Sequence, residues 1–204
     1  MNSKERVKKA VKFDNSDKVP FAHWIIPSAI FKYGNSLIDI IKNNPDDFDS
    51  YPDDFGFKIN EDNSLTLDPR FKKGEFTDEL GCVWSTEHDG MIGYITKNPL
   101  KDLNLNGYRW PDPDKSINWK SVSGEIEKNG HERYIFGLGA QYFERLHYLT
   151  GFEETLIGLY EGKKELRQIA DGILDFNLKV IENWCKLDID CFMFFDDLGT
   201  QTQL

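Results

Sequence analysis

Apolar residues recur at helical spacing in several parts of this 204-residue chain. Residues 3–12 carry apolar side chains on one side and lysines around the rest, which predicts a short helix. A second short helix is expected over 36–45, where Asn and Pro end the pattern, and others over 119–129 and from Gln141 onward. The clearest helix is predicted over 163–187, where one face carries Leu166, Ile169, Ala170, Ile173, Leu174, Val180, Ile181, Trp184 and Leu187.

Three other segments, residues 19–26, 133–139 and 188–195, have the composition of strands. The last of these, "DIDCFMFF", lacks alternation, which is typical of a strand covered on both faces in a parallel sheet. Strand, helix and strand then follow one another in the second half, with room for right-handed crossovers. We therefore predict an α/β fold that forms the N-terminal part of a (β/α)₈ TIM barrel, since about eight strands are needed for closure. The last strand would lie at an open, apolar edge.

Residues 51–102 differ from the rest, because strand-like residues alternate on both sides of Asp89-Gly90. That dipeptide favours a type I′ turn, so we expect a small antiparallel β-hairpin excursion inserted in a single, incomplete domain over 1–204. The stretch after it, "YRWPDPD", is expected to be a loop, because Pro111 and Pro113 disfavour helix and central strand.

The charge of the chain excludes some classes of partner. With 25 basic and 35 acidic residues the net charge is −10, which argues against general binding to nucleic acid or to an anionic membrane. Three cysteines without framework spacing predict a reduced, cytoplasmic compartment. The first residues lack the apolar core of a signal peptide, and no stretch approaches the roughly 20 apolar residues of a membrane span.

Asp196 and Asp197 directly follow the last predicted strand. Ligands of parallel α/β folds bind outside the carboxyl ends of the strands, so these acids are candidates for catalysis or for binding a polar ligand. Two adjacent carboxylates can differ in pKa, so that one donates a proton while the other stays charged. The alternative is that one caps the next helix or turn and the other faces solvent.

His23 and Trp24 lie near the end of the first predicted strand, and so on the same side of the sheet. A histidine there can orient a substrate or transfer a proton, or it can simply be partly buried with its hydrogen bonds satisfied. In "GLGAQ", Gly139 and Gln141 follow a strand where a helix opens, a place that suits close approach of a ligand or an anion. A tight turn explains the same glycines.

The remaining cysteines and histidines form no recognised zinc spacing. Cys82 lies near His88 in the excursion, and Cys185 and Cys191 flank the junction of the last helix and strand. We expect each cysteine to be a small buried apolar residue and assign no metal ligand. His147 is expected to lie on a helix surface or to pack against it.

Four stretches carry a resemblance to a known family: "SKERVKKAVKFDNSDKVPF", "DELGCVWSTEHDGMIGYITKNPLKD", "YRWPDPD" and "FFDDLGTQTQL". In this order and spacing they resemble the uroporphyrinogen decarboxylase-like family, and most closely its branch related to cobalamin-dependent methyltransferases. The resemblance covers all 204 residues. It implies a (β/α)₈ barrel with its active cleft at the carboxyl face, and members that continue beyond the position of Leu204, so that this chain looks C-terminally truncated.

The resemblance also bears on the reaction. Uroporphyrinogen decarboxylases carry an R-Q-A-G-R-Y stretch after the first strand, whose cations hold the acidic side chains of the tetrapyrrole. The corresponding stretch here, "HWIIPSAIFKYG", contains no arginine, which counts against that substrate because buried charge without a partner is costly. The methyltransferase branch uses zinc to deprotonate an acceptor thiol, and its H-x-C pair and distant Cys would fall after Leu204.

The resemblance therefore implies a component of a corrinoid-dependent methyltransferase, with a corrinoid protein, or a tetrapyrrole or other small-molecule substrate, as partner. Asp196 and Asp197 would be its catalytic residues, and His23, Trp24, Gly139 and Gln141 would bind substrate. Zinc and a corrinoid are expected only with the full-length protein. The alternatives are decarboxylation of a tetrapyrrole in porphyrin biosynthesis and, in another class, a non-catalytic binding module.

Overall fold

The computed structural model describes residues 1–51, 56–128 and 132–199. Its elements, in chain order, are α1 (Ser3–Val11), α2 (Pro27–Tyr33), α3 (Asn35–Asn43), β1 (Phe48–Tyr51), β2 (Phe57–Ile59), β3 (Leu65–Leu67), the 3₁₀ helix η1 (Pro69–Phe71), β4 (Gly74–Thr77), β5 (Val83–Thr86), β6 (Tyr94–Lys97), α4 (Pro113–Ser116), α5 (Trp119–Lys128), β7 (Tyr134–Ala140), α6 (Phe143–Thr150), α7 (Phe152–Glu161), α8 (Lys164–Trp184) and β8 (Cys191–Phe194). The chain is thus mixed α/β, as the sequence predicts.

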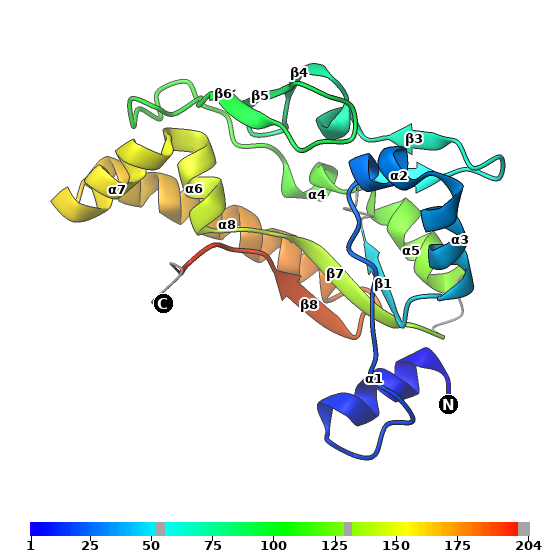
Figure 1. The fold of residues 1–204 in the computed structure, drawn as a ribbon. Coiled ribbons are helices and arrows are strands. Elements are labelled where there is room, and N and C mark those ends of the chain that lie inside the picture. The colour runs from blue at the N-terminus through cyan, green and yellow to red at the C-terminus, as the bar shows by residue number, and fades with distance from the viewer. Residues whose placement is uncertain (52–55, 129–131, 200–204) are drawn as a thin grey trace.

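A parallel sheet of order β1-β7-β8 forms the centre of the molecule (Figure 1). β1 pairs with β7 from Phe48 opposite Tyr134, and β7 pairs with β8 from Phe136 opposite Cys191. The connection from β7 to β8 runs through three helices, of which α8 packs back on the sheet (Figure 1). Within the described residues this sheet is open, with β1 and β8 at its edges.

Large apolar side chains fill the space between the sheet and helices α5 and α8. Trp184 is fully buried there, and its indole N–H donates to the backbone oxygen of Leu138 at 2.8 Å. Gly137 leaves room for that ring, since a Cβ at residue 137 would lie 2.8 Å from the Trp184 side chain. The cluster consists of Tyr51, Val122, Ile126, Ile135, Phe176, Val180 and Trp184. This packing fixes the carboxyl end of β7 against α8.

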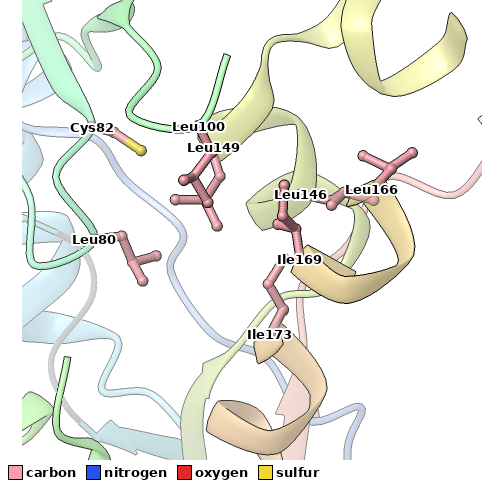
Figure 2. Packing of buried hydrophobic residues seen from close by; sticks show 8 residues of the cluster. All are labelled: Leu80, Cys82, Leu100, Leu146, Leu149, Leu166, Ile169 and Ile173. Carbon is pink, nitrogen blue, oxygen red and sulfur yellow. The ribbon is translucent and has the colours of Figure 1, made fainter. Parts of the chain in front are cut away.

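The excursion contains two antiparallel units, a β2-β3 hairpin and a β4-β5-β6 sheet. A second apolar cluster joins the β4-β5-β6 unit to the helices: Leu80 and Cys82 face side chains from α6 and α8 (Figure 2). Its members are Leu80, Cys82, Leu100, Leu146, Leu149, Leu166, Ile169 and Ile173. The excursion therefore forms one wall beside α6, at the end of the sheet where β7 finishes.

Helix α1 covers the opposite, amino end of the sheet (Figure 1). A capping box between Asn2 and Glu5 starts the helix, because each side chain accepts from the other residue's backbone N–H. Lys4 contributes its amide to the oxygen of Glu132 at 2.9 Å and its ammonium to Asp190 at 3.0 Å. Asp190 directly precedes β8, so α1 is attached to the starting points of β7 and β8.

Three local expectations were wrong in ways that have physical causes. Residues 19–26 form no strand, and the strand beside β7 is β1, whose short sequence "FDSY" contains two polar residues and gives no strand signal. Pro113 begins α4 rather than excluding it, because the first helical position needs no N–H donor. The β5-β6 hairpin is present, but φ is positive at Gly90 and not at Asp89, which excludes the type I′ turn.

The helices expected near residues 3–12, 36–45, 119–129 and 163–187 are all present, with ends shifted by a few residues. Part of the excursion predicted over 51–102 lies outside the described residues, at 52–55. In the described part of the chain, no helix combines the length and the apolar character that crossing a bilayer requires.

Candidate functional site

Asp196 is held at the start of helix α6. One carboxylate oxygen accepts the backbone N–H groups of Tyr142 and Phe143, each at 2.9 Å, and the other accepts that of Glu144 at 2.8 Å. The first N–H groups of a helix have no partner inside it, and Tyr142 supplies no side-chain cap. Asp196, which follows β8, therefore caps α6. The sequence alternative was a cap on the next helix or turn, but α6 precedes Asp196 in the chain.

Asp197, by contrast, is exposed, and its charge acts on the side chains of α6. Burial raises the pKa of Glu144, and the charges of Asp196 and Asp197 add to that rise, while hydrogen bonds from Tyr148 and Gln141 oppose it. Glu144 is therefore a carboxyl group that takes up a proton more readily than an ordinary glutamate. It also lies within electrostatic range of the exposed carboxylate of Asp197 at the strand exit.

Two other side chains of α6 extend this group. Burial raises the pKa of Tyr148 to about 12, and Glu144 contributes by its charge and by accepting a hydrogen bond. Burial lowers the pKa of His147, against the opposing charges of Asp196 and Asp197. The His147 ring contacts the rings of Phe143, Tyr148 and Phe152, so its packing on the helix is as the sequence predicts.

Arg145 is the residue of this region that sequence reasoning missed. Its side chain is 10% exposed, and within the described part of the chain its one ion pair joins Nη1 to Glu79 Oε1 at 3.5 Å. The guanidinium carbon lies 5.5 Å from the centre of the Phe176 ring, and Nε has no hydrogen-bond partner. The signal in the sequence was an arginine four residues after Gln141 at the opening of a helix, but spacing alone does not show that it is buried.

Gln141 and Gly139 lie where β7 ends. The Gln141 side chain donates to Glu144, and its backbone oxygen accepts from Asn177 at 2.8 Å. Gly139 has φ of +118° beside a register shift in the β7-β8 ladder, which gives this glycine a backbone reason. The structure thus joins Gln141, Glu144 and Asp196 directly, while Gly139 shapes the strand beneath them.

His23 and Trp24 turn to different parts of the sheet. The His23 ring and backbone N–H both bond Asp46, two residues before β1, so this side chain lies toward the amino end of that strand. The Trp24 ring lies 5.3 Å from that of Phe195, directly before Asp196. Among the described residues no hydrogen bond or ion pair links His23 to Asp196 or Asp197, so only Trp24 meets the strand exit.

The three cysteines do not join this group of side chains to form a metal site among the described residues. Cys82 is buried, its pKa is raised chiefly by burial, and its thiol donates to the Tyr148 backbone oxygen at 3.3 Å. Cys191 is half-buried, whereas Cys185 is exposed, unlike the buried position expected of it. No cluster of three or more His, Cys, Asp or Glu suited to a metal occurs within residues 1–51, 56–128 and 132–199.

The fold and this group of side chains together define a mixed α/β protein with polar and ionisable residues gathered at the carboxyl end of a parallel sheet. Searches against family models, curated proteins and solved structures found no match to this chain.

Proposed function

We propose that this chain belongs to a cytoplasmic barrel enzyme of the uroporphyrinogen decarboxylase-like family that takes part in methyl transfer to or from a corrinoid protein. The parallel sheet is then the first part of a (β/α)₈ barrel, and the group around Asp196 and Asp197 is part of its active cleft. The methyl-transfer chemistry rests on the sequence resemblance, while the position of the cleft rests on geometry.

The observation that carries the proposed cleft is the convergence of β7, α6 and β8 on one set of polar side chains. Asp196 bonds the first amides of α6, and Gln141 and Glu144 follow β7 within the same network. In parallel α/β folds this end of the sheet is where ligands bind. The excursion packs against α6 and α8 beside this end of the sheet.

Within this proposal the side chains have different roles. Asp196 is a positioning residue, because its carboxylate is already taken up by backbone N–H groups. Asp197 has an exposed carboxylate and is the catalytic candidate, and Glu144 is a second proton-exchanging group, with its pKa raised by burial. Trp24 supplies an aromatic surface near Phe195, which suits a flat substrate. His23 stays a weaker candidate, because Asp46 holds it.

The zinc that the resemblance implies does not fit the described residues. No suitable group of His, Cys, Asp or Glu occurs within them, and the Cys82 thiol is buried against a backbone oxygen. We therefore assign no step of the reaction to a metal held by these residues.

The test uses the protein expressed from its complete reading frame, with methylcobalamin and a panel of small thiols. A thiolate that attacks the methyl carbon breaks the cobalt–carbon bond, the electron pair stays on cobalt, and the change in absorbance reports cob(I)alamin. We expect turnover that Asp197→Asn lowers by at least about a hundredfold, the lower end of what a general acid or base contributes. Asp14→Asn, also an exposed aspartate, serves as the matched control and should leave turnover unchanged.

The methyl-transfer assay and a parallel decarboxylation assay together separate the methyltransferase, the decarboxylase and the non-catalytic binding module. Carbon dioxide release from uroporphyrinogen would favour the decarboxylase. The buried Arg145 supports this alternative, because its cation could hold an acidic side chain of the tetrapyrrole. Absence of both reactions with every donor and acceptor, in a folded protein, would reject the enzyme and leave a non-catalytic binding module.

A further inference from the structure

Arg145 is buried without the partners that a buried guanidinium needs. The residue is 9% exposed, Nε has no hydrogen-bond partner, and the contact with Glu79 measures 3.5 Å, beyond the usual range for a charged hydrogen bond. Glu79 itself is half exposed, so water competes for it. Of the five N–H donors of the guanidinium, the Nε–H is the one that is buried without a partner among the described residues, and leaving such a donor unpaired away from water is costly.

Asn177 presents a second polar atom without a partner at the same helix interface. It is 4% exposed, its amide N–H donates to the oxygen of Gln141, and its Oδ1 accepts no hydrogen bond. Arg145 follows Gln141 by four residues, and its guanidinium lies over the ring of Phe176, which directly precedes Asn177 in the sequence of α8. These two are the buried side chains in the described part of the chain that keep such an atom. One is a donor and the other an acceptor.

The nearby carboxylates are already engaged and do not satisfy Arg145. Asp78 accepts the amides of Leu80 and Cys82 and the indole N–H of Trp84, at 2.8 to 3.0 Å. Asp196 accepts the amides at the start of α6. Glu79 is thus the one carboxylate that contacts the guanidinium among the described residues, and it does so at long range.

We propose that Arg145 holds a carboxylate of the substrate at the carboxyl end of β7, and that Glu79 is a displaceable internal carboxylate that occupies the guanidinium in the free protein. This inference rests on the proposed function, because it takes that end of the sheet as the ligand side and adds the class of ligand. A carboxylate would pair with the N–H groups that Glu79 leaves weakly bound.

The surroundings of Arg145 select for a single negative charge. Asp78, Glu79 and Glu144 all lie close enough to act electrostatically on Cys82 or Tyr148, the neighbours of Arg145. A phosphate dianion would be repelled by these acids more strongly than a monocarboxylate. The site is therefore assigned to a carboxylic acid.

The experiment follows the side-chain Nε–H resonance of Arg145 in the protein from the complete reading frame. The signal is identified by its loss in Arg145→Lys. Acetate, added at constant ionic strength against chloride, should shift it along a saturable curve, and phosphate should bind more weakly. Glu79→Gln removes the internal competitor and should lower the dissociation constant for acetate about two- to fivefold, the effect of one exposed ion pair. Glu75→Gln, an exposed glutamate on β4, should leave it unchanged.

A role for Arg145 in packing alone predicts the opposite pattern. Absence of a saturable acetate shift, equal dissociation constants for wild type and Glu79→Gln, or tighter binding of phosphate than of acetate would each overturn the proposal. The measurement requires no turnover. Acetate binding without methyl transfer would reject only the proposed function, and methyl transfer with an inert Arg145 would reject only this inference.

Discussion

Arg6 and Arg145 are equally buried, at 9% exposure each, yet Arg6 is well paired with carboxylates and Arg145 is poorly paired. Arg6 donates through Nε and Nη2 to Asp17 at 2.7 and 3.1 Å, and through Nη1 to Asp47. Among the residues that the structure describes, Arg145 has one long contact with Glu79, and its Nε has no hydrogen-bond partner. Both arginines face a similar energetic cost of burial, so the two ends of the sheet differ in how completely they compensate a buried guanidinium.

At the amino end of the sheet, the guanidinium of Arg6 is paired with two carboxylates. Asp47 is 1% exposed and has a lowered pKa, because hydrogen bonds from Ser3, Phe21 and Arg6 outweigh the opposing effect of burial. The carboxyl end keeps a donor on Arg145, an acceptor on Asn177 and the exposed Asp197. In barrel-type α/β folds the first end serves stability and the second serves chemistry. The unpaired Nε–H of Arg145 points to a ligand site because the equivalent N–H of Arg6, equally buried, is paired.

The largest expected effect on stability comes from removing Asp47, the acidic partner of Arg6, and it should far exceed the effect of removing Glu79, the partner of Arg145. Asp47→Ala should lower the free energy of unfolding by about 3 kcal/mol, because it breaks a buried pair and leaves Arg6 with less compensation. Glu79→Ala should change it by less than about 1 kcal/mol, as for an exposed pair. Urea unfolding followed by circular dichroism measures both. Equal losses would remove the contrast between the two ends.

Asp196 and Asp197, at the exit of β8, allow a second comparison between a bonded and an exposed carboxylate, with a smaller expected effect on stability. Asp196→Ala should cost about 2 kcal/mol of unfolding free energy, because the first N–H groups of α6 lose their cap. Its neighbour is the matched control: Asp197→Ala should stay within about 0.5 kcal/mol. The same urea titration distinguishes them, and a larger loss for Asp197 than for Asp196 would exchange their assigned roles.

Much of the fold was accessible from the sequence, because strong periodicity survives in it. The apolar stripe of α8 and the glycine-rich end of β7 gave the correct elements, and the uniformly apolar segment around Cys191–Phe194 gave a parallel strand. β1 was missed since two of its four residues are polar and its partner, β7, is more than 80 residues away. Pairing over that distance leaves no local pattern.

The candidate site was accessible only in part. Strand ends pointed to Asp196, Asp197 and Gln141, but the sequence gave no means to separate the aspartate that caps α6 from the one left exposed. His23 was grouped with them by its distance from a predicted strand end, and its bond to Asp46 could not be foreseen. Arg145 was missed because burial without a partner is a property of the packed structure.

The most direct measurement is hydrogen exchange at the Nε–H groups of Arg6 and Arg145 in one sample, with and without acetate. If the carboxyl end is left open for a ligand, acetate slows exchange at Arg145 and leaves Arg6 unchanged, since Asp17 already holds the Arg6 proton. Equal protection of both groups without acetate, and no change on adding it, would contradict the account.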